Sequence, residues 1–296
     1  MRATEGQLEI TIMLTNDFNA QCDHFDLEKY LRISGATRPE AFDWSEPGSR
    51  LDDDALFCLG YMMDIESHTV IYMKELLSTS VAEDPSITAF LSCWVYEEFF
   101  HSQVLKRFLE SQGLTVEDAR FTELRRRKAS RRIAEKIAGV ASHLTRHFPA
   151  VHMTWGAINE LSTLTGYHAM IERTRHPLLT TLMGRIIKDE RRHFSFYFNQ
   201  ARRMLQDPSA RRLTAFLVRH FWTPVGSPVR GDADAHRICR FLFPGDEGRR
   251  RLAEMDGTIA RLPGLGWFDL GTRYCFVRDA KESEASAFNT SAHQAV

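Results

Sequence analysis

The sequence predicts an all-α protein in which a four-helix bundle forms the core and additional helices flank it. Four segments carry apolar residues at alternating steps of three and four, the spacing that places side chains on one face of a helix. Helix start and stop signals bound these segments, and no extended alternation of polar and apolar residues indicates a strand. Each apolar stripe also contains residues that can bind a metal, so we expect a metal site inside the bundle.

The first helix is predicted to begin near Asp52 to Asp54, whose acidic side chains suit a helix N-terminus, and to run to about Ser80. A single charged residue, Glu66, interrupts its apolar stripe, so we expect Glu66 to point into the core. The other positions on this stripe are Leu56, Leu59, Met63, Val70, Met73 and Leu77.

The second helix is predicted to start at Pro85, with Asp84 as its N-cap, and to end at Gly113. Its stripe contains both Glu98 and His101, which lie one turn apart and must therefore both point inward. The other positions are Ile87, Leu91, Trp94, Leu105 and Phe108.

The third helix is predicted to follow Pro149 and to extend to about Arg175, with a weaker stripe that carries a lone carboxylate. This stripe consists of Met153, Gly156, Glu160, Thr163, Tyr167 and Met170. Pro177 opens the fourth helix and Pro208 closes it. The Glu-x-x-His spacing recurs on the fourth stripe, which reads Leu179, Met183, Ile186, Glu190, His193, Tyr197, Gln200 and Met204.

The remaining chain is expected to surround this core. Residues 1–51 are predicted to form an irregular N-terminal arm packed on the bundle, residues 52–280 the helical domain, and residues 281–296 a flexible tail. A connecting helix is predicted between 122 and 147, and it begins with the basic block Arg125 to Arg132. Shorter amphipathic segments are predicted at 213–221 and 238–243.

The bulk composition bounds the classes of function. A net charge of −1 and a pI near 6.9 give the whole molecule no electrostatic bias toward nucleic acid or an anionic membrane. We expect a cytoplasmic protein, because no apolar run reaches the length of a membrane span and the N-terminus does not resemble a signal peptide. The odd number of cysteines and their single spacing argue against a disulfide framework; they are Cys22, Cys58, Cys93, Cys239 and Cys275.

Four carboxylates facing one core need compensating charge, because burying each of them alone would cost several kcal/mol and favour protonation. A pair of cations supplies that charge. Ferritin-like carboxylate proteins use one Glu from each of two helices and a Glu-x-x-His from each of the other two. This chain supplies that set in the order Glu, Glu-x-x-His, Glu, Glu-x-x-His. The six predicted ligands are Glu66, Glu98, His101, Glu160, Glu190 and His193. Mixed oxygen and nitrogen ligation suits two iron ions, or manganese, better than zinc or calcium; the alternative is a buried charge network.

Two segments carry a resemblance to a known family. Residues 97–101 (EEFFH) and 188–193 (KDERRH) resemble the EExxH and DExRH signatures of the soluble acyl-carrier-protein desaturases, and the likeness spans roughly residues 52 to 206. The resemblance implies a homodimeric di-iron enzyme that uses dioxygen and a ferredoxin-type electron donor to desaturate an acyl chain held on acyl carrier protein. It also implies that Glu98 and Glu190 bridge the metals.

Three further positions agree with the family pattern, and each has a simpler alternative. The resemblance implies that Asp189 accepts the outer N–H of a ligand imidazole, although a surface ion pair with Arg192 or Arg185 would also suit it. Thr163 is implied to lie beside the oxygen-binding face, or it bonds its own helix carbonyl. Trp94 is implied to contact a ligand, or it only packs.

A desaturase also needs an apolar slot and a docking surface for its acidic carrier. At helical spacing aromatic and Met side chains are more often simple core than slot. The candidates for the slot are Tyr61, Met62, Phe99, Phe100, Tyr167, Phe194 and Phe196. The basic block Arg125 to Arg132 could receive the carrier and its phosphate, or form a solvated helix face.

Other ferritin-like proteins match less well. Leu105 stands where the ribonucleotide reductase small subunit has a radical tyrosine, and Ile186 stands where arylamine N-oxygenases have a seventh ligand. Two alternatives to a desaturase stay open: another di-metal oxygenase that oxidises an amino or hydroxyl compound, and a non-catalytic metal-binding bundle.

Overall fold

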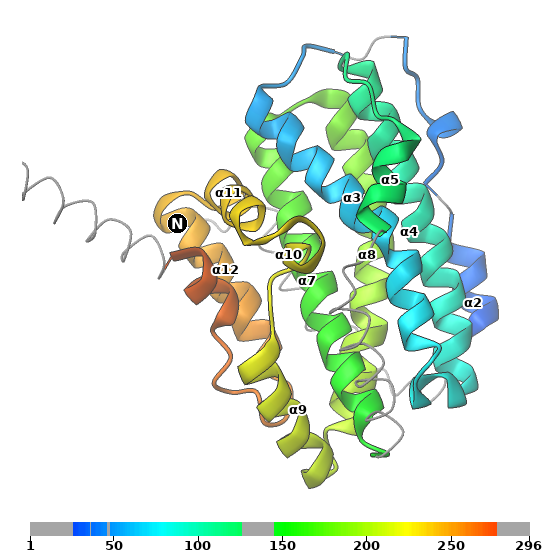
Figure 1. The fold of residues 1–296 in the computed structure, drawn as a ribbon, viewed down its shortest axis with the longest axis vertical. Coiled ribbons are helices and arrows are strands. Elements are labelled where there is room, and N and C mark those ends of the chain that lie inside the picture. The colour runs from blue at the N-terminus through cyan, green and yellow to red at the C-terminus, as the bar shows by residue number, and fades with distance from the viewer. Residues whose placement is uncertain (1–25, 36, 46–47, 126–144, 277–296) are drawn as a thin grey trace, which may run out of the picture.

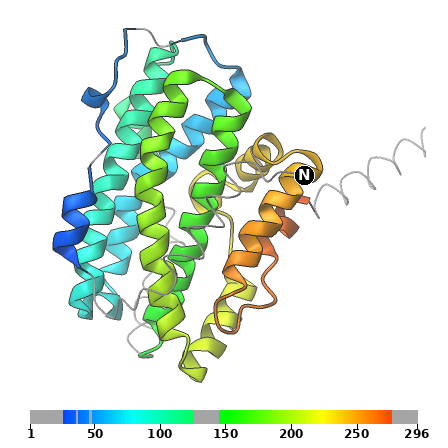
Figure 2. The ribbon, with the colours of Figure 1, turned by 180° about the vertical axis from the view of Figure 1, so that it is seen from behind.

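Four long helices form the core of the computed structural model, which describes residues 26–35, 37–45, 48–125 and 145–276 (Figure 1). Helix α3 packs against α4, α7 packs against α8, and α4 also contacts α8 (Figure 2). The bounds of these helices are Asp53–Leu76 for α3, Pro85–Ser111 for α4, Phe148–Thr174 for α7 and Pro177–Met204 for α8. The described residues contain no strand, so the predicted all-α bundle is confirmed.

The predicted start signals act as caps. The Asp84 carboxylate accepts hydrogen bonds from the backbone N–H groups of Ser86 and Ile87 at 2.8 and 3.2 Å, directly before Pro85 opens α4. Helix α3 ends at Leu76, four residues before the predicted Ser80. The chain leaves the helix because Thr79 caps a separate 3₁₀ turn, Ser80–Glu83.

The apolar stripes of α4 and α8 face the core as predicted, whereas the stripe of α3 does so only in its first half. Val70 and Leu77 are 41% and 43% exposed, so their predicted core positions are wrong. Leu77 follows Leu76, the last residue of α3, so the helical spacing no longer applies to it. Val70 lies within the helix, and its exposure has no explanation among the described contacts.

The N-terminal arm contains a helix that the sequence analysis did not predict. Helix α2, Leu27–Ile33, is capped by Asp26, and its Tyr30 is buried against α4, where it meets the edge of Phe90. A 3₁₀ turn follows at Pro39–Ala41. The arm is therefore packed on the bundle as expected, but it is not irregular throughout. Residues 1–25 lie outside the described residues.

The connection between α4 and α7 is described only at its two ends. Helix α5, Asp118–Arg125, is fixed to α3 by Arg120, whose guanidinium donates to both oxygens of the buried Asp64 at 2.7 Å. The predicted helix between 122 and 147 falls mostly on residues 126–144, which are outside the described residues. The same holds for the basic block beyond Arg125 and for the predicted tail, 281–296.

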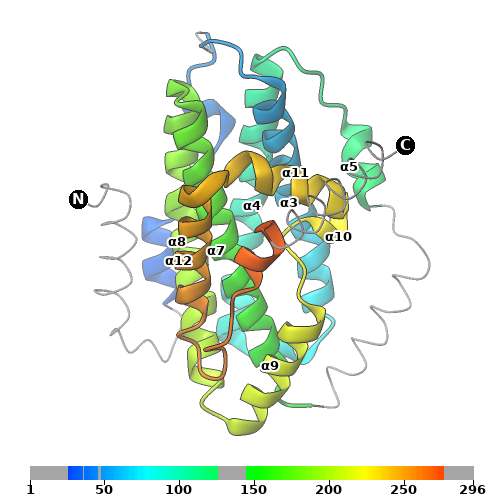
Figure 3. The same cartoon turned by 90° about the vertical axis from the view of Figure 1, so that its left-hand side faces the viewer.

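A layer of shorter helices covers the face formed by α7 and α3 (Figure 3). It consists of α9 (Pro208–Phe221), α10 (Ser227–Arg230), α11 (Asp232–Leu242), α12 (Gly245–Ile259) and a final helical segment at 270–276. The amphipathic segments predicted at 213–221 and 238–243 fall in α9 and at the end of α11. Among the described helices, none has the length and apolar character that crossing a membrane requires.

Candidate metal centre

The six predicted ligands converge in the middle of the four-helix core. Two groups of four residues each bring one ligand atom per residue within 4.8 Å of the others, and every member is buried. The first group is Glu66, Glu98, His101 and Glu190, and the second is Glu98, Glu160, Glu190 and His193. Glu98 and Glu190 belong to both groups, which is the arrangement that two bridging carboxylates require.

Both imidazoles present the same nitrogen to the carboxylates. The Nδ1 atom of His101 lies 3.3 Å from Glu98 Oε2 and 3.1 Å from Glu190 Oε1. The Nδ1 atom of His193 lies 3.1 Å from Glu98 Oε1 and 3.3 Å from Glu190 Oε2. The two Glu-x-x-His segments therefore place equivalent donor atoms on either side of the shared carboxylates.

The outer nitrogen of each imidazole meets a carboxylate from the opposite helix. The Nε2 atom of His101 lies 3.1 Å from Asp189 Oδ2, and that of His193 lies 2.8 Å from Glu97 Oε2. A carboxylate there holds the proton on Nε2 and leaves the Nδ1 lone pair for a metal. The predicted contact of Asp189 with an imidazole is present, and so is its alternative, an ion pair with Arg192 at 2.5 Å.

Glu97 is the functional residue that the sequence analysis missed. The signal was available, because an acidic residue precedes the ligand carboxylate in both Glu97-Glu98 and Asp189-Glu190. Because both segments are helical, the same offset sends each acidic side chain toward the histidine of the opposite helix. Glu97 therefore does for His193 what Asp189 does for His101.

Donors from the arm and from α8 hold Glu97 in its ionised form. The Tyr30 phenol donates to Glu97 Oε2 at 2.5 Å, the Ser34 hydroxyl donates to Oε1, and Arg192 lies 2.7 Å from Oε1. Burial alone would raise the pKa of Glu97, but the hydrogen bond and charge of His193, together with the two hydroxyls, lower that pKa to about 2. Arg192 contacts both outer carboxylates and links the two halves of the site.

Each lone carboxylate receives a hydrogen bond from an aromatic side chain. The Tyr167 phenol donates to Glu66 Oε1, and the Trp94 indole donates to Glu160 Oε1 at 3.0 Å. The implied contact of Trp94 with a predicted ligand is therefore present. The sequence analysis treated Tyr167 only as a slot or core residue, and its position one turn after Thr163 on the stripe does not by itself identify a donor.

The charges of the site favour bound protons or a cation. Burial and the nearby carboxylates Glu98 and Glu190 raise the pKa of Glu66 well above its usual range, and burial and Glu190 do the same for Glu160. Burial alone would lower the pKa of His101, but the adjacent carboxylates of Asp189, Glu190 and Glu98 raise it well above the usual value. Positive charge is thus stabilised at the centre of the cluster.

Two buried atoms in the cluster fit metal ligation. His101 Nδ1 and Glu190 Oε1 make no hydrogen bond within the part of the chain that the structure describes. Buried polar atoms are normally satisfied, so both need another partner. Four carboxylates and two imidazoles form a donor set for a hard or borderline divalent cation. The cluster could therefore hold a metal ion.

Comparison with protein-family models and with curated proteins returns no match for this chain. Its function is therefore inferred from the chemistry of the site and of the cavities around it.

A polar cavity of about 260 Å³ opens onto the cluster. All four predicted carboxylate ligands line it, together with Trp94, Thr163, Tyr197 and residues 223–226, 228 and 229. Tyr197 approaches α7 at Gly156, where a Cβ atom would collide with the tyrosine ring. A small polar molecule in this cavity would contact the carboxylates directly.

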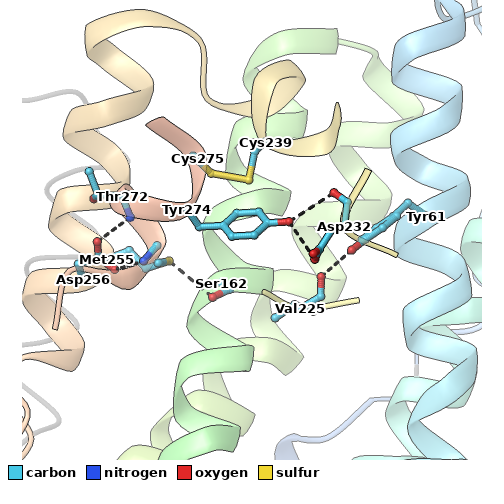
Figure 4. Close-up of a disulfide and its surroundings, with 11 residues drawn as sticks. Tyr61, Ser162, Val225, Asp232, Cys239, Met255, Asp256, Thr272, Tyr274 and Cys275 are labelled. Atoms are coloured by element: carbon cyan, nitrogen blue, oxygen red, sulfur yellow. Dashed lines mark hydrogen bonds between the residues drawn. A yellow bond between two sulfur atoms is a disulfide. The ribbon is translucent and has the colours of Figure 1, made fainter. Parts of the chain in front are cut away.

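An apolar cavity of about 110 Å³ lies beside the polar one. The two cavities share Ile65, Glu66, Thr163, Pro224 and Val225. The apolar cavity continues from this shared wall to the layer of α11, α12 and the final helical segment (Figure 4). It thus connects the metal cluster with an apolar space.

The predicted slot residues divide into two sets. Tyr61, Met62 and Tyr167 line the apolar cavity. The four phenylalanines of the prediction, Phe99, Phe100, Phe194 and Phe196, line neither of these two cavities. Phe99, Phe100 and Phe194 follow a ligand by one or two positions, and steps of about 100° per residue turn them away from the face of that ligand. Phe196 stacks on Phe90 at 3.7 Å between ring centroids.

Thr163 lies on the wall that both cavities share. Its neighbours Ser162 and Thr165 bond the carbonyls of their own helix, at 2.7 and 2.6 Å. The Thr163 hydroxyl makes no such bond to any described residue, so the alternative considered for it is not observed. Its hydroxyl remains available to a molecule in either cavity.

A disulfide between Cys239 and Cys275 forms part of the wall of the apolar cavity (Figure 4). The sequence argued against a disulfide framework, and this pair was not predicted. The two residues are 36 positions apart, and α11 and the final helical segment bring their Cα atoms to 5.6 Å. Neither the count nor the spacing of cysteines could reveal a pair formed by tertiary packing.

Proposed function

We propose that the chain is a di-iron, oxygen-dependent desaturase that introduces a double bond into an acyl chain carried on acyl carrier protein. The observation that carries the proposal is the meeting of an apolar cavity and a cluster of candidate metal ligands at Glu66 and Thr163. A site that oxidises an unactivated C–H bond needs both features in contact, because the apolar chain must lie beside the metals.

The two groups of ligands would hold one ion each. Glu66 and His101 would bind one ion, Glu160 and His193 the other, and the shared carboxylates would bridge them. The ligand types suit iron, and manganese would also fit. When bound, an iron pair supplies the activation of dioxygen and the oxidising power that removes hydrogen from the acyl chain.

The protein residues supply orientation and exclude water. Asp189 and Glu97 fix both imidazoles with Nδ1 toward the metals. The Thr163 hydroxyl can donate a hydrogen bond to a small oxygen-containing ligand in the polar cavity, while apolar side chains hold the acyl chain in the other. Overall, two hydrogens from the acyl chain, two electrons and two protons reduce dioxygen to two waters, and a ferredoxin-type donor supplies the electrons.

The carrier protein, the electron donor, the homodimer and the cytoplasmic location remain predictions from the resemblance and the sequence. The basic block proposed to receive the carrier lies almost entirely outside the described residues. Support for the substrate class therefore comes from the apolar cavity and from the two signature segments.

The test reconstitutes the full chain with ferrous iron and incubates it with dioxygen, a ferredoxin reducing system and a panel of acyl carrier protein thioesters. We expect two irons per chain by elemental analysis and, by mass spectrometry, an acyl product that lacks two hydrogens. Oxygen added to an amino or hydroxyl compound, with no alkene formed, would favour the N-oxygenase-like alternative. Metal uptake without oxygen consumption would favour a non-catalytic bundle.

A Thr163→Val variant tests the shared wall, because it removes the hydroxyl and keeps the side-chain shape. We expect an unchanged iron content and a lower yield of alkene per oxygen consumed. The matched control is Ser162→Ala, which removes the neighbouring hydroxyl that already bonds its own helix. Equal coupling in all three proteins would contradict the role of Thr163.

A further inference from the structure

A line of aromatic side chains leads from the metal cluster toward the surface. Trp94 donates to Glu160 at 3.0 Å, and its ring lies 6.1 Å from that of Tyr72 between centroids. Tyr72 in turn has its phenol oxygen 3.3 Å from His152 Nδ1. Trp94 is buried, whereas Tyr72 and His152 are half-buried. Indole and phenol side chains are readily oxidised by one electron, so an electron could pass from Tyr72 through Trp94 to the cluster.

Two phenols contact Trp94, but only one has a base beside it. The ring of Tyr197 lies 5.8 Å from that of Trp94, yet its hydroxyl is buried and makes no hydrogen bond within the described residues. An oxidised phenol must give its proton to an acceptor to become a neutral radical. Without such an acceptor, an oxidised Tyr197 would remain a buried cation. Tyr72 instead faces His152, which can accept that proton.

His152 can accept the proton of Tyr72 once the phenol is oxidised. Burial lowers the pKa of the imidazole to about 3, which keeps it neutral near pH 7 and makes it a weak base, but an oxidised phenol is a far stronger acid than the imidazolium. With its proton on Nε2, His152 offers the Nδ1 lone pair to the phenol. The ring also meets the edges of Phe148 and Tyr72, at 4.7 and 6.1 Å between centroids, which fixes its orientation. Tyr72 and Trp94 both line the polar cavity that the four carboxylates border.

We propose that Trp94 and Tyr72 form a one-electron relay that reduces the oxidised metal centre when no acyl chain is bound, with His152 receiving the proton of Tyr72. The inference rests on the proposed function, because the metal centre after its reaction with dioxygen is the oxidant. Such a relay protects the carboxylate ligands from oxidative damage by moving the oxidising equivalent to a half-buried side chain.

The step balances in atoms and electrons. Tyr72 loses one electron, which passes through Trp94 to the metal centre and reduces it by one equivalent. The phenolic O–H bond breaks, and the proton forms a new N–H bond at Nδ1 of His152. The products are a neutral tyrosyl radical and an imidazolium. The external electron donor later returns one electron to Tyr72, and the proton moves back from His152.

The experiment uses electron paramagnetic resonance. The iron-loaded full chain, reduced and free of acyl substrate, is mixed with dioxygen and frozen at successive times. We expect a tyrosyl signal, which narrows when the protein contains ring-deuterated tyrosine and is lost in a Tyr72→Phe variant. The matched control is Tyr96→Phe, the same substitution at a tyrosine outside the relay. Tyr96 is exposed, and its hydroxyl accepts a hydrogen bond from Arg38 on the arm. His152→Phe should reduce the yield of the radical.

Iron content and the thermal midpoint are measured for each variant, so that loss of the signal is not mistaken for loss of the fold. A signal of unchanged size in Tyr72→Phe would overturn the relay, and so would the absence of any signal from a parent protein that consumes oxygen. Alkene production is assayed separately. Alkene without a radical removes the relay alone, a radical without alkene removes the desaturase proposal alone, and a chain that takes up no metal removes both.

Discussion

The two halves of the candidate metal cluster have matching candidate ligands and different surroundings. In each half a histidine turns Nδ1 inward and gives Nε2 to a carboxylate of the opposite helix. The carboxylate behind His101, Asp189, accepts a hydrogen bond from Thr37 at 3.2 Å. The carboxylate behind His193, Glu97, accepts two hydroxyls from α2 and the residue that ends it. The arm thus holds one half more firmly than the other.

The lone carboxylates differ in the same way. Glu66 receives a phenol and borders both cavities, whereas Glu160 receives the indole of Trp94 and borders only the polar one. The set of candidate ligands is nearly symmetric, but the residues and cavities around it differ between the side of Glu66 and the side of Glu160. The side of Glu66 faces the apolar space proposed for the substrate, and the side of Glu160 faces the aromatic line to Tyr72.

The largest loss of bound metal is expected when a carboxylate shared by both halves is removed. Glu98 belongs to both groups of ligands, so Glu98→Ala should abolish binding at both positions and leave almost no metal per chain. Helix content should stay close to that of the parent, because Ala suits a helix interior. Elemental analysis and circular dichroism measure the two quantities. Glu110→Ala on the same helix, outside the cluster, is the control; full metal occupancy in Glu98→Ala would contradict the assignment.

Removal of metal should lower the thermal midpoint by several degrees, because a ligand present at 100 to 1,000 times its dissociation constant stabilises the folded state by about 3–4 kcal/mol. The loss should depend on pH. Burial and neighbouring carboxylates raise the pKa of Glu66 and Glu160, and hydrogen bonds raise that of His101 and His193 against the effect of burial. In the metal-free protein these groups bind protons more tightly when folded.

Their contribution to stability is therefore complete at acidic pH. It is lost as the pH rises above about 4.5 for the carboxyls and above about 6.5 for the imidazoles, through the raised pKa values. Metal displaces the protons, so the difference in midpoint between metal-loaded and metal-free protein should grow with pH. Calorimetric scans from acidic to mildly basic buffers measure it. A constant or shrinking difference would argue against a carboxylate and imidazole site.

Substitution of the carboxylate that contacts Nε2 of each histidine should weaken metal binding in one half of the cluster and not in the other. Asp189→Asn should weaken the ion bound by His101, and Glu97→Gln the ion bound by His193, each by about 10–100-fold in affinity. Glu97→Gln should have the larger effect, because its carboxylate also accepts from two hydroxyls and holds a pKa of about 2. Calorimetric titration with ferrous iron under anaerobic conditions would report one tight and one weak ion. Equal weakening of both ions in either variant would show that the halves are not separable.

The convergence of the six candidate ligands in the core could be predicted from sequence because helical periodicity is local. Once Glu98, His101, Glu190 and His193 fall on apolar stripes, the helix geometry alone turns them into the core. The same geometry relates Asp189 to the opposite histidine. This reasoning fails at Val70, which is exposed.

The surroundings could not be predicted, because they depend on contacts between distant segments. Tyr30 reaches Glu97 across 67 positions of the chain, and Tyr167 reaches Glu66 across 101. The apolar cavity and its disulfide exist only because α11 and the last helical segment fold back over α7 and α3. The differences between the two halves of the cluster therefore come from tertiary contacts, whereas their similarity comes from the spacing of residues within each helix.

The smallest effect should come from the hydroxyls of the arm. Ser34→Ala removes a donor to the ionised Glu97, and Thr37→Val removes a donor to Asp189. A hydrogen bond to a charged group contributes about 1.5–3 kcal/mol when buried, and Ser34 is half-buried, so we expect a loss near the lower end of that range. Thr37→Val should cost less, because its bond is 3.2 Å long and Val fills the same buried space. Thermal midpoints of the metal-loaded proteins measure both losses. A larger loss in Thr37→Val than in Ser34→Ala would reverse the order of the two halves and contradict the view that α2 holds the His193 side more firmly.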